Sequence, residues 1–404
     1  MDWGRKLAGM LLLVLFILTM ANDKVQSYLQ IPNEITTFES ASSYIEEMLE
    51  GSGQVTVKKE KPASATVEVG GLPPKQTSVK KIPDLKVIPG GDSIGVKLQS
   101  DGVMIVGFHD VVDGKERFSP AKKAGLKPGD RIVEMNGNEI DKLEDVVHGL
   151  EEMNQERRLT MKIKRNTDLH EISVNLHQGK EGNVLGAYIR NAASGVGTLT
   201  FYEPEQGKFG SLGHVIADSD TKKPITVENG KIMKSSVTSI QRGTNGDPGE
   251  KQATLASDRE ELGEVTKNTS FGVFGKLDAD KMDPHKPMPV AFAQEVKPGP
   301  AKMLTVIEDE KIEAFDIEIV QSMPQMQAAS KGMVIKVKDE ELLERTGGII
   351  QGMSGSPIIQ DGKIAGAVTH VFVNDSTSGY ACHIEWMLEE AGIDTFAEER
   401  QGAA

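Results

Sequence analysis

The chain is poor in cysteine, in positive charge and in aromatic residues. Cys382 is the only cysteine among 404 residues, so no internal disulfide can form, and any exported form must be stable without one. Cys382 lies in an apolar stretch, which favours a buried small side chain over a reactive thiol. The formal net charge of −14 disfavours a general nucleic-acid binder, because such proteins gain affinity from lysine and arginine on phosphates. No group of His, Cys and Asp has ligand spacing, so we expect no metal and no other cofactor.

Long amphipathic helices are missing from the second half of the chain. From about residue 181 onward, short alternating or apolar runs recur between Gly-rich turns, and only 384–392 has the pattern of a terminal helix. Forty-two glycines and 18 prolines against 5% aromatic residues agree with this, because turns are frequent in β-rich folds. We therefore predict a mostly β protein of two or three domains, in which 181–404 is a barrel or sandwich.

The N-terminus has the pattern of a targeting segment. Arg5 and Lys6 precede an apolar run over 7–21, which is short for a spanning helix and suits a signal-peptide core. Because no clear cleavage site follows, we predict an uncleaved signal-anchor over 1–24, with a cleaved signal and a buried core helix as alternatives. The positive flank places the N-terminus in the cytoplasm and the rest of the chain across the membrane.

Residues 25–84 are predicted to connect this segment to the first domain. The stretch 35–50 has the apolar stripe of a short amphipathic helix, with a capping box at Thr36 and Glu39 and a stop at Gly51. The stretch 51–84 is rich in Lys, Pro, Ser, Thr and Gly, which is typical of a linker and leaves room for one isolated strand.

A compact domain is predicted over 85–178. Its strongest feature is the string 119–137, SPAKKAGLKPGDRIVEMNG, which predicts a one-turn helix ended by Gly125, a tight turn at 128–130, a strand, and a hairpin at Asn136-Gly137. A second helix over 143–153 and strands near 158–164 and 171–176 complete the pattern.

This string resembles the PDZ family signature, and 85–178 is similar to PDZ domains of bacterial export-linked proteases. The resemblance implies a peptide groove between a strand and the second helix, where a bound peptide adds a strand. It places the carboxylate-binding loop at Ser93, Ile94, Gly95 and Val96.

The segment 352–357, GMSGSP, carries the chemistry of a serine nucleophile. Such a hydroxyl must project from a tight turn beside N–H groups that converge on the developing oxyanion, and glycines allow that backbone. Residues 354–370 closely resemble the nucleophile segment of chymotrypsin-like peptidases. The resemblance makes Ser354 the nucleophile, with Ser356 as the alternative, and forms the oxyanion hole from the N–H groups of Gly352 and Ser354. It also implies that Val368, Thr369 and His370 form the strand that pairs with the substrate backbone.

A serine nucleophile needs a base and an orienting acid. His214 follows a Gly/Ser turn and precedes the serine, as the chymotrypsin-like chain order requires, so we predict that it is the base. Ten aspartates lie between His214 and Ser354, and sequence alone does not select one of them.

The whole arrangement resembles the stage IV sporulation protein B family of signalling serine peptidases. The resemblance rests on the order anchor, linker, PDZ and terminal domain, on GSLGHVI (210–216) and GGIIQGMSGSPI (347–358), and on 370–380 and 383–388. It implies a chymotrypsin-like double β-barrel over 181–404. It also makes Asp339 the triad acid, with Asp316 second.

The resemblance further implies a role and a location. Such a protein is exported into the space between forespore and mother cell, cleaves itself, and cuts the extracytoplasmic part of a membrane regulator of an intramembrane metalloprotease. Processing of sigma factor K follows. Two other functions stay open, a general quality-control protease with a PDZ domain and a non-catalytic peptide-binding adaptor.

Overall fold

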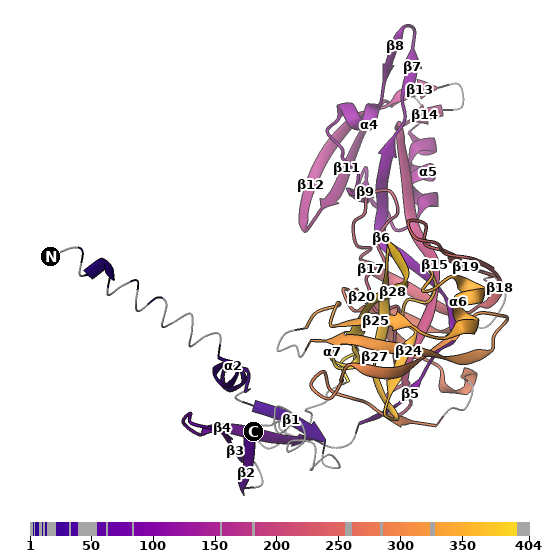
Figure 1. Cartoon of the computed structure of the whole chain (residues 1–404). Coiled ribbons are helices and arrows are strands. Elements are labelled where there is room, and N and C mark those ends of the chain that lie inside the picture. The colour runs from indigo at the N-terminus through magenta and orange to yellow at the C-terminus, as the bar shows by residue number, and fades with distance from the viewer. Residues whose placement is uncertain are drawn as a thin grey trace. The chain divides into compact units, whose positions relative to one another are not determined.

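The computed structural model describes residues 22–31, 34–38, 55–61, 64–82, 85–153, 156–179, 182–254, 261–282, 286–323 and 328–393, with a few positions between 3 and 13. The chain divides into two units, 1–85 with 394–404 and 86–393 (Figure 1). Within the described residues, no helix combines the length and the apolar character that a membrane crossing needs. The predicted anchor falls largely on positions outside the described residues.

The first unit contains one helix and a four-stranded sheet. The helix is α2 (Asp23–Gln30), and the strands are β1 (Glu34–Phe38), β2 (Val55–Lys61), β3 (Ser64–Val69) and β4 (Lys75–Ile82), in the order β1-β4-β3-β2. The predicted helix over 35–50 is therefore wrong over 35–38, and 39–50 lie outside the described residues. The predicted linker is wrong as well, because the stretch forms the strands β2, β3 and β4. In β3 the side chains at alternate positions, Ala65, Val67 and Val69, are buried on one face.

The second unit begins with a β-barrel whose strands come from both sides of the PDZ domain. The strands of this first barrel are β6 (Ser93–Phe108), β15 (Ala187–Glu203), β16 (Lys208–Ser211), β17 (Val227–Lys234), β20 (Glu261–Thr269) and β21 (Gly272–Leu277). They pair in the order β6-β17-β20-β21-β16-β15, and β15 pairs with β6 to close the ring. Strand β5 (Lys86–Pro89) pairs with β15, and β22 (Met288–Pro289) pairs with the other edge of β5.

A second barrel follows, and it is closed in the order β23-β24-β25-β28-β27-β26. Its strands are β23 (Gly299–Val306), β24 (Ile312–Ser322), β25 (Met333–Val337), β26 (Pro357–Gln360), β27 (Lys363–Phe372) and β28 (Asp375–His383). Helix α6 (Glu340–Thr346) precedes β26, and α7 (Ile384–Glu390) matches the predicted terminal helix. Hairpin β18 (Ser236–Gln241) and β19 (Glu250–Thr254) and the short helix η2 (Ala279–Lys281) complete the two-barrel region. The predicted double-barrel peptidase fold is confirmed.

The PDZ domain contains the predicted elements. They are α4 (Pro120–Lys123), β9 (Arg131–Met135), β10 (Asn138–Glu139), α5 (Leu143–Glu152), β11 (Arg158–Arg165) and β12 (Asp168–Asn175). Two hairpins lie at its margin, β7 (Val111–Asp113) with β8 (Glu116–Phe118), and β13 (His177–Gly179) with β14 (Gly182–Val184). Asn136 and Gly137 have φ of 48° and 87°, as a two-residue hairpin turn requires.

Strands β6 and β15 belong to both domains (Figure 1). The first part of β6 pairs with β17 in the barrel, whereas Val103 and Met104 pair with β9 of the PDZ domain. The barrel strand that precedes the PDZ domain thus lies at 93–100, and the PDZ domain is inserted between it and the rest of the barrel. The predicted boundary, with the whole peptidase after residue 181, is corrected accordingly.

Candidate active site

The predicted nucleophile lies on a turn that only glycine can flank. Gly352 and Gly355 have φ of 92° and 93°, which is the left-handed region. A Cβ on Gly355 would lie 2.2 Å from the carbonyl oxygen of Thr198 and 2.4 Å from the backbone nitrogen of Leu212, both in the first barrel. The turn 352–355 therefore packs so closely against the first barrel that position 355 has no room for a side chain.

Two threonines of β15 hold this turn, and sequence reasoning missed both. The backbone N–H of Thr198 donates to the carbonyl of Ser354 at 3.0 Å, and its hydroxyl donates to the carbonyl of Gly352 at 2.8 Å. The hydroxyl of Thr200 donates to the carbonyl of Gly355 at 2.7 Å. The signal in the sequence is a pair of threonines at alternate positions of an apolar strand, which places two hydroxyls on one inward face.

Ser354 is better placed to react than Ser356. Ser356 is fully buried, and its hydroxyl contacts that of Thr198 at 3.5 Å. Ser354 is half-buried, and its hydroxyl donates to the carbonyl of Thr369 at 3.0 Å. The hydroxyl of Ser354 can reach a substrate without unpacking the core, which that of Ser356 cannot.

The predicted oxyanion donors keep free N–H groups. Next to them, the N–H of Met353 donates to Ile350 and that of Gly355 donates to Val368. The N–H groups of Gly352 and Ser354 find no acceptor in the part of the chain that the structure describes. Two free donors on either side of Met353 are the arrangement that an oxyanion hole needs.

His214 lies on a turn against the strand that carries Thr369. A Cβ on Gly213 would lie 3.0 Å from both the Cγ2 of Thr369 and the carbonyl of Val368. The Nδ1 of His214 lies 3.0 Å from the carbonyl of Val215. Because a carbonyl only accepts, Nδ1 carries the proton of the neutral ring, and Nε2 keeps the lone pair of a base.

The electrostatics keep His214 neutral. Burial lowers the pKa of His214, and the hydrogen bond to Val215 opposes this shift only in part. The ring of His370 lies 5.1 Å away, centroid to centroid, and burial lowers the pKa of His370 too. Ser354 and His214 thus flank the same segment, 369–370, although the Ser354 hydroxyl is bonded to Thr369 and not to His214.

The structure does not bring Asp339 or Asp316 to His214. Asp339 is the N-cap of α6, and its carboxylate accepts from the N–H groups of Leu342 at 3.0 Å and Asp316 at 3.3 Å. The carboxylate of Asp316 bonds to the amine of Lys302 at 2.7 Å. Aspartate is a preferred N-cap residue, and this local role accounts for the position of Asp339.

The predicted substrate strand is available only in part. The N–H and the carbonyl of Val368 bond to Ser356 and Gly355, so Val368 cannot pair with a substrate. Thr369 follows and is buried, whereas His370 is exposed and lines a cavity of about 440 Å³. The cavity is lined by Lys331, His370, Val371, Phe372, Val373, Asn374, Asp375 and Tyr380.

The predicted carboxylate-binding loop of the PDZ domain is wrong. Ser93, Ile94, Gly95 and Val96 form a buried stretch of β6 that pairs with β15 on one edge. Its other edge, from Ile94 to Val96, pairs with β17. Because both edges of the strand are hydrogen-bonded, no peptide can add to it there. The S-I-G-V pattern reflects a barrel strand with apolar residues facing the core.

A buried lysine supports the nucleophile turn from behind, and sequence reasoning missed it. Lys251 of β19 is 1% exposed, and its amine donates to the hydroxyl of Thr305 at 2.7 Å. Burial lowers the pKa of Lys251 to about 7. A Cβ on Gly352 would lie 3.0 Å from the Cβ of Lys251, so the lysine stem forms the wall behind the turn.

Two other groups are inert. Cys382 is fully buried, and burial raises its pKa to about 12, so it is a thiol at neutral pH. His383 is buried as well, and burial lowers its pKa to about 4. Nowhere in the described ranges do three or more His, Cys, Asp or Glu side chains gather as a metal site would need.

Comparisons with known proteins found similar families, sequences and structures. Residues 93–176 match the PDZ domain family. The chain is similar to the "Probable periplasmic serine endoprotease DegP-like" of Chlamydia pneumoniae, with 34% identity over 127 residues that span 31% of this chain and 24% of that protein.

Solved structures of the Rv3671c protease of M. tuberculosis are also similar to this chain. The active form shares 15% identity over 50% of this chain and 75% of that one, with a TM-score of 0.28. The inactive form shares 17% identity over 49% and 84%, with a TM-score of 0.28.

Residues 181–388, about half of the chain, match the family described as SpoIVB peptidase S55. They contain His214, the nucleophile turn and the whole second barrel. The chain belongs to the SpoIVB peptidase S55 family, which is a family of peptidases.

Proposed function

We propose that the chain cleaves peptide bonds with Ser354 as nucleophile and His214 as general base. The observation that carries the proposal is the turn 352–355, where a half-buried serine hydroxyl lies beside two unbonded N–H groups and next to the segment that His214 contacts. Each of these features has a chemical role in acyl transfer, and none is needed for packing alone.

The bond from Ser354 to the Thr369 carbonyl is a resting arrangement. A substrate that lies along Thr369 and His370 offers its own backbone N–H to that carbonyl. The Ser354 hydroxyl is then released and turns to Nε2 of His214. Substrate binding thereby brings Ser354 and His214 together, and the enzyme is inactive without substrate.

The chemical step then follows from the positions of the donors. The oxygen of Ser354 attacks the scissile carbonyl carbon while its proton passes to Nε2 of His214. The oxyanion that forms accepts from the N–H groups of Gly352 and Ser354. His214 returns the proton to the leaving amine as the peptide bond breaks, and water hydrolyses the acyl-enzyme by the same steps. The Val215 carbonyl keeps Nδ1 protonated throughout, which is the task an aspartate has in a triad.

We further propose a signalling role across a membrane. The enzyme would cleave itself and then the extracytoplasmic part of a membrane regulator, so that sigma factor K processing begins. The family membership and the Arg5-Lys6 flank before the apolar run support this proposal. The site of action would be the space between forespore and mother cell, with the N-terminal segment in the membrane.

The experiment is self-cleavage of the full chain in lipid vesicles. We expect the variant Ser354→Ala to lose about 10³- to 10⁶-fold in rate, because the attacking hydroxyl is gone. Ser356→Ala is the matched control and should cleave at nearly the wild-type rate. A fluorophosphonate label mapped to Ser354 would confirm the nucleophile. Cleavage by Ser354→Ala at the wild-type rate would exclude the proposal.

General quality control is the second candidate, because the similar chlamydial protein is named a periplasmic serine endoprotease. Broad degradation of unfolded casein by the wild-type chain, without preference for the membrane regulator, would favour it over signalling.

A further inference from the structure

The joint between the PDZ domain and the first barrel is a defined structure in β6 and β15. The pairing of the two strands shifts register between Arg190 and Ala192, where Ala192 pairs with Gln99 but Arg190 pairs with Met104. The hydroxyl of Ser100 crosses this bulge and donates to the carbonyls of Gly102 at 2.8 Å and Asn191 at 3.3 Å. The two domains are thus connected through a bulge whose backbone is hydrogen-bonded in place.

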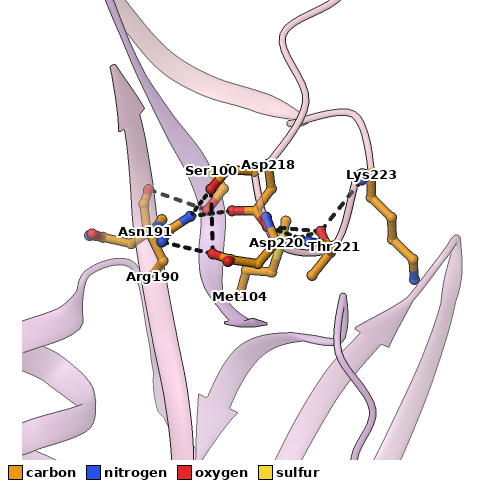
Figure 2. A network of polar contacts seen from close by, with 9 residues as sticks. Ser100, Met104, Arg190, Asn191, Asp218, Asp220, Thr221 and Lys223 are labelled. Carbon is orange, nitrogen blue, oxygen red and sulfur yellow. Dashed lines mark hydrogen bonds and ion pairs between the residues drawn. The ribbon is translucent and has the colours of Figure 1, made fainter. Parts of the chain in front are cut away.

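Arg190 projects from this joint toward the loop that follows His214 (Figure 2). Its guanidinium donates to Asp218 at 2.7 Å and to the hydroxyl of Ser219 at 3.1 Å, and it pairs with Asp220 at 2.9 Å. The strand shared by both domains is therefore bonded to the loop that follows His214, the proposed base.

Asp218 is the buried centre of this network. Its side chain is 3% exposed, and its second oxygen accepts from the N–H groups of Asp220 at 3.1 Å and Thr221 at 2.8 Å. Burial alone would raise the pKa of Asp218, but the hydrogen bonds from Thr221, Asp220 and Arg190 outweigh it and lower that pKa. A buried carboxylate needs its cationic partner, so this ion pair is far more consequential than an exposed one.

The same loop contacts the PDZ domain directly. A Cβ on Gly129, in the turn before β9, would lie 2.5 Å from the amine of Lys223. The hydroxyl of Thr221 lies 3.8 Å from the sulfur of Met104, where β6 has entered the PDZ domain. The tip of the loop thus rests on the PDZ side of the joint.

The root of the loop is attached to the barrel. The side-chain amide of Asn268, in β20, accepts from the N–H of Ile216 at 2.8 Å. It donates to the carbonyls of Ile216 and Ile225, each at 2.8 Å. The loop is thus bonded to the barrel at its root and contacts the PDZ side of the joint at its tip.

We propose that Arg190 and Asp218 are positioning residues that transmit the placement of the PDZ domain to His214. The proposal rests on the function assigned to His214 above. A shift of β15 at Arg190 pulls Asp218, and the chain from Asp218 back to His214 is too short and too well bonded to absorb it. A ligand or contact on the PDZ domain therefore changes the reach of His214 toward Ser354.

The test compares full-chain variants that break the contact at either end. We expect Arg190→Met and Asp218→Asn each to lower kcat about 10- to 100-fold with KM nearly unchanged, because a base displaced by about 1 Å costs rate in this range. The double variant should lose no more than the worse single variant, since both act through one contact. Arg190→Lys should recover part of the rate.

Controls separate positioning from folding. Asp220→Asn removes an exposed partner of the same arginine and should change kcat by less than about threefold. Thermal unfolding of each variant, followed by circular dichroism, shows which ones fold as the wild type does. For the folded variants, the rate of fluorophosphonate labelling at Ser354 should fall in step with kcat.

The outcomes are distinguishable. A folded Arg190→Met chain with wild-type kcat and labelling rate overturns the inference. If His214→Ala retains activity as well, the assigned base is wrong and the proposed function fails with it. If His214→Ala is inactive while Arg190→Met is fully active, only the transmission through Asp218 is excluded.

Discussion

With His214 as the proposed base, its protonation sets the pH dependence of activity, because only the neutral ring accepts the proton of Ser354. The ordinary pKa of histidine is 6.5, and burial lowers the pKa of His214 below that value. The ring therefore stays neutral at pH values where a free histidine is already charged.

We expect kcat/KM to rise with a midpoint below pH 6.5. A profile of kcat/KM from about pH 5 to about pH 8 on a peptide substrate measures this midpoint.

The contribution of His214 to folding stability also increases with pH. The unfolded ring takes up a proton between pH 6.5 and the lower folded pKa, so the stability contributed by neutral His214 is complete above pH 6.5 and lost below it. A flat activity profile would remove His214 as the base.

Asp339 is the residue on which sequence and structure differ most. As an N-cap of α6 it tolerates asparagine, which caps helices as well as aspartate does. We therefore expect Asp339→Asn to keep kcat/KM within about a factor of three, while Asp339→Ala loses about 1 kcal/mol of stability. A fall of about 10⁴-fold for Asp339→Asn, with stability unchanged, would instead identify the triad acid, since a triad aspartate does not tolerate that change.

At the scale of elements, the active site depends on β15 more than on any helix. This strand presents Thr198 and Thr200 to the nucleophile turn, and its other end carries Arg190 into the PDZ domain. A strand that is hydrogen-bonded along both domains is a stiff support, which suits a site whose donors must stay fixed during the reaction.

Removal of the Thr198 hydroxyl tests this support. Thr198→Val keeps the shape but leaves the Gly352 carbonyl without its partner, which costs about 1–3 kcal/mol. We expect kcat to fall about tenfold, because that free energy is lost from the turn that carries the proposed oxyanion donors. Thr266→Val, on an exposed part of β20, is the control and should leave kcat unchanged. An equal effect of both variants on kcat would show that the support is not specific.

At the scale of the whole molecule, the PDZ domain is an insertion and not a preceding module. Since β6 begins in the barrel and ends in the PDZ domain, neither can fold with its complete sheet when the chain is cut between them. This continuity, together with the network at Arg190, connects the PDZ domain to the loop that follows His214, the proposed base.

The sequence determined the parts whose cause is local. Glycines at 352 and 355 around a serine, the Asn136-Gly137 turn and the alternation within strands act over a few residues, so they could be predicted together with the PDZ elements and the two-barrel class. Tertiary structure alone decided which strand Ser93–Val96 belongs to, that Thr198 and Lys251 support the nucleophile turn, and that the carboxylates of Asp339 and Asp316 bond to groups other than His214. These depend on contacts between residues up to about 150 positions apart, and no local pattern encodes which partner a buried polar group meets when the chain closes into a barrel.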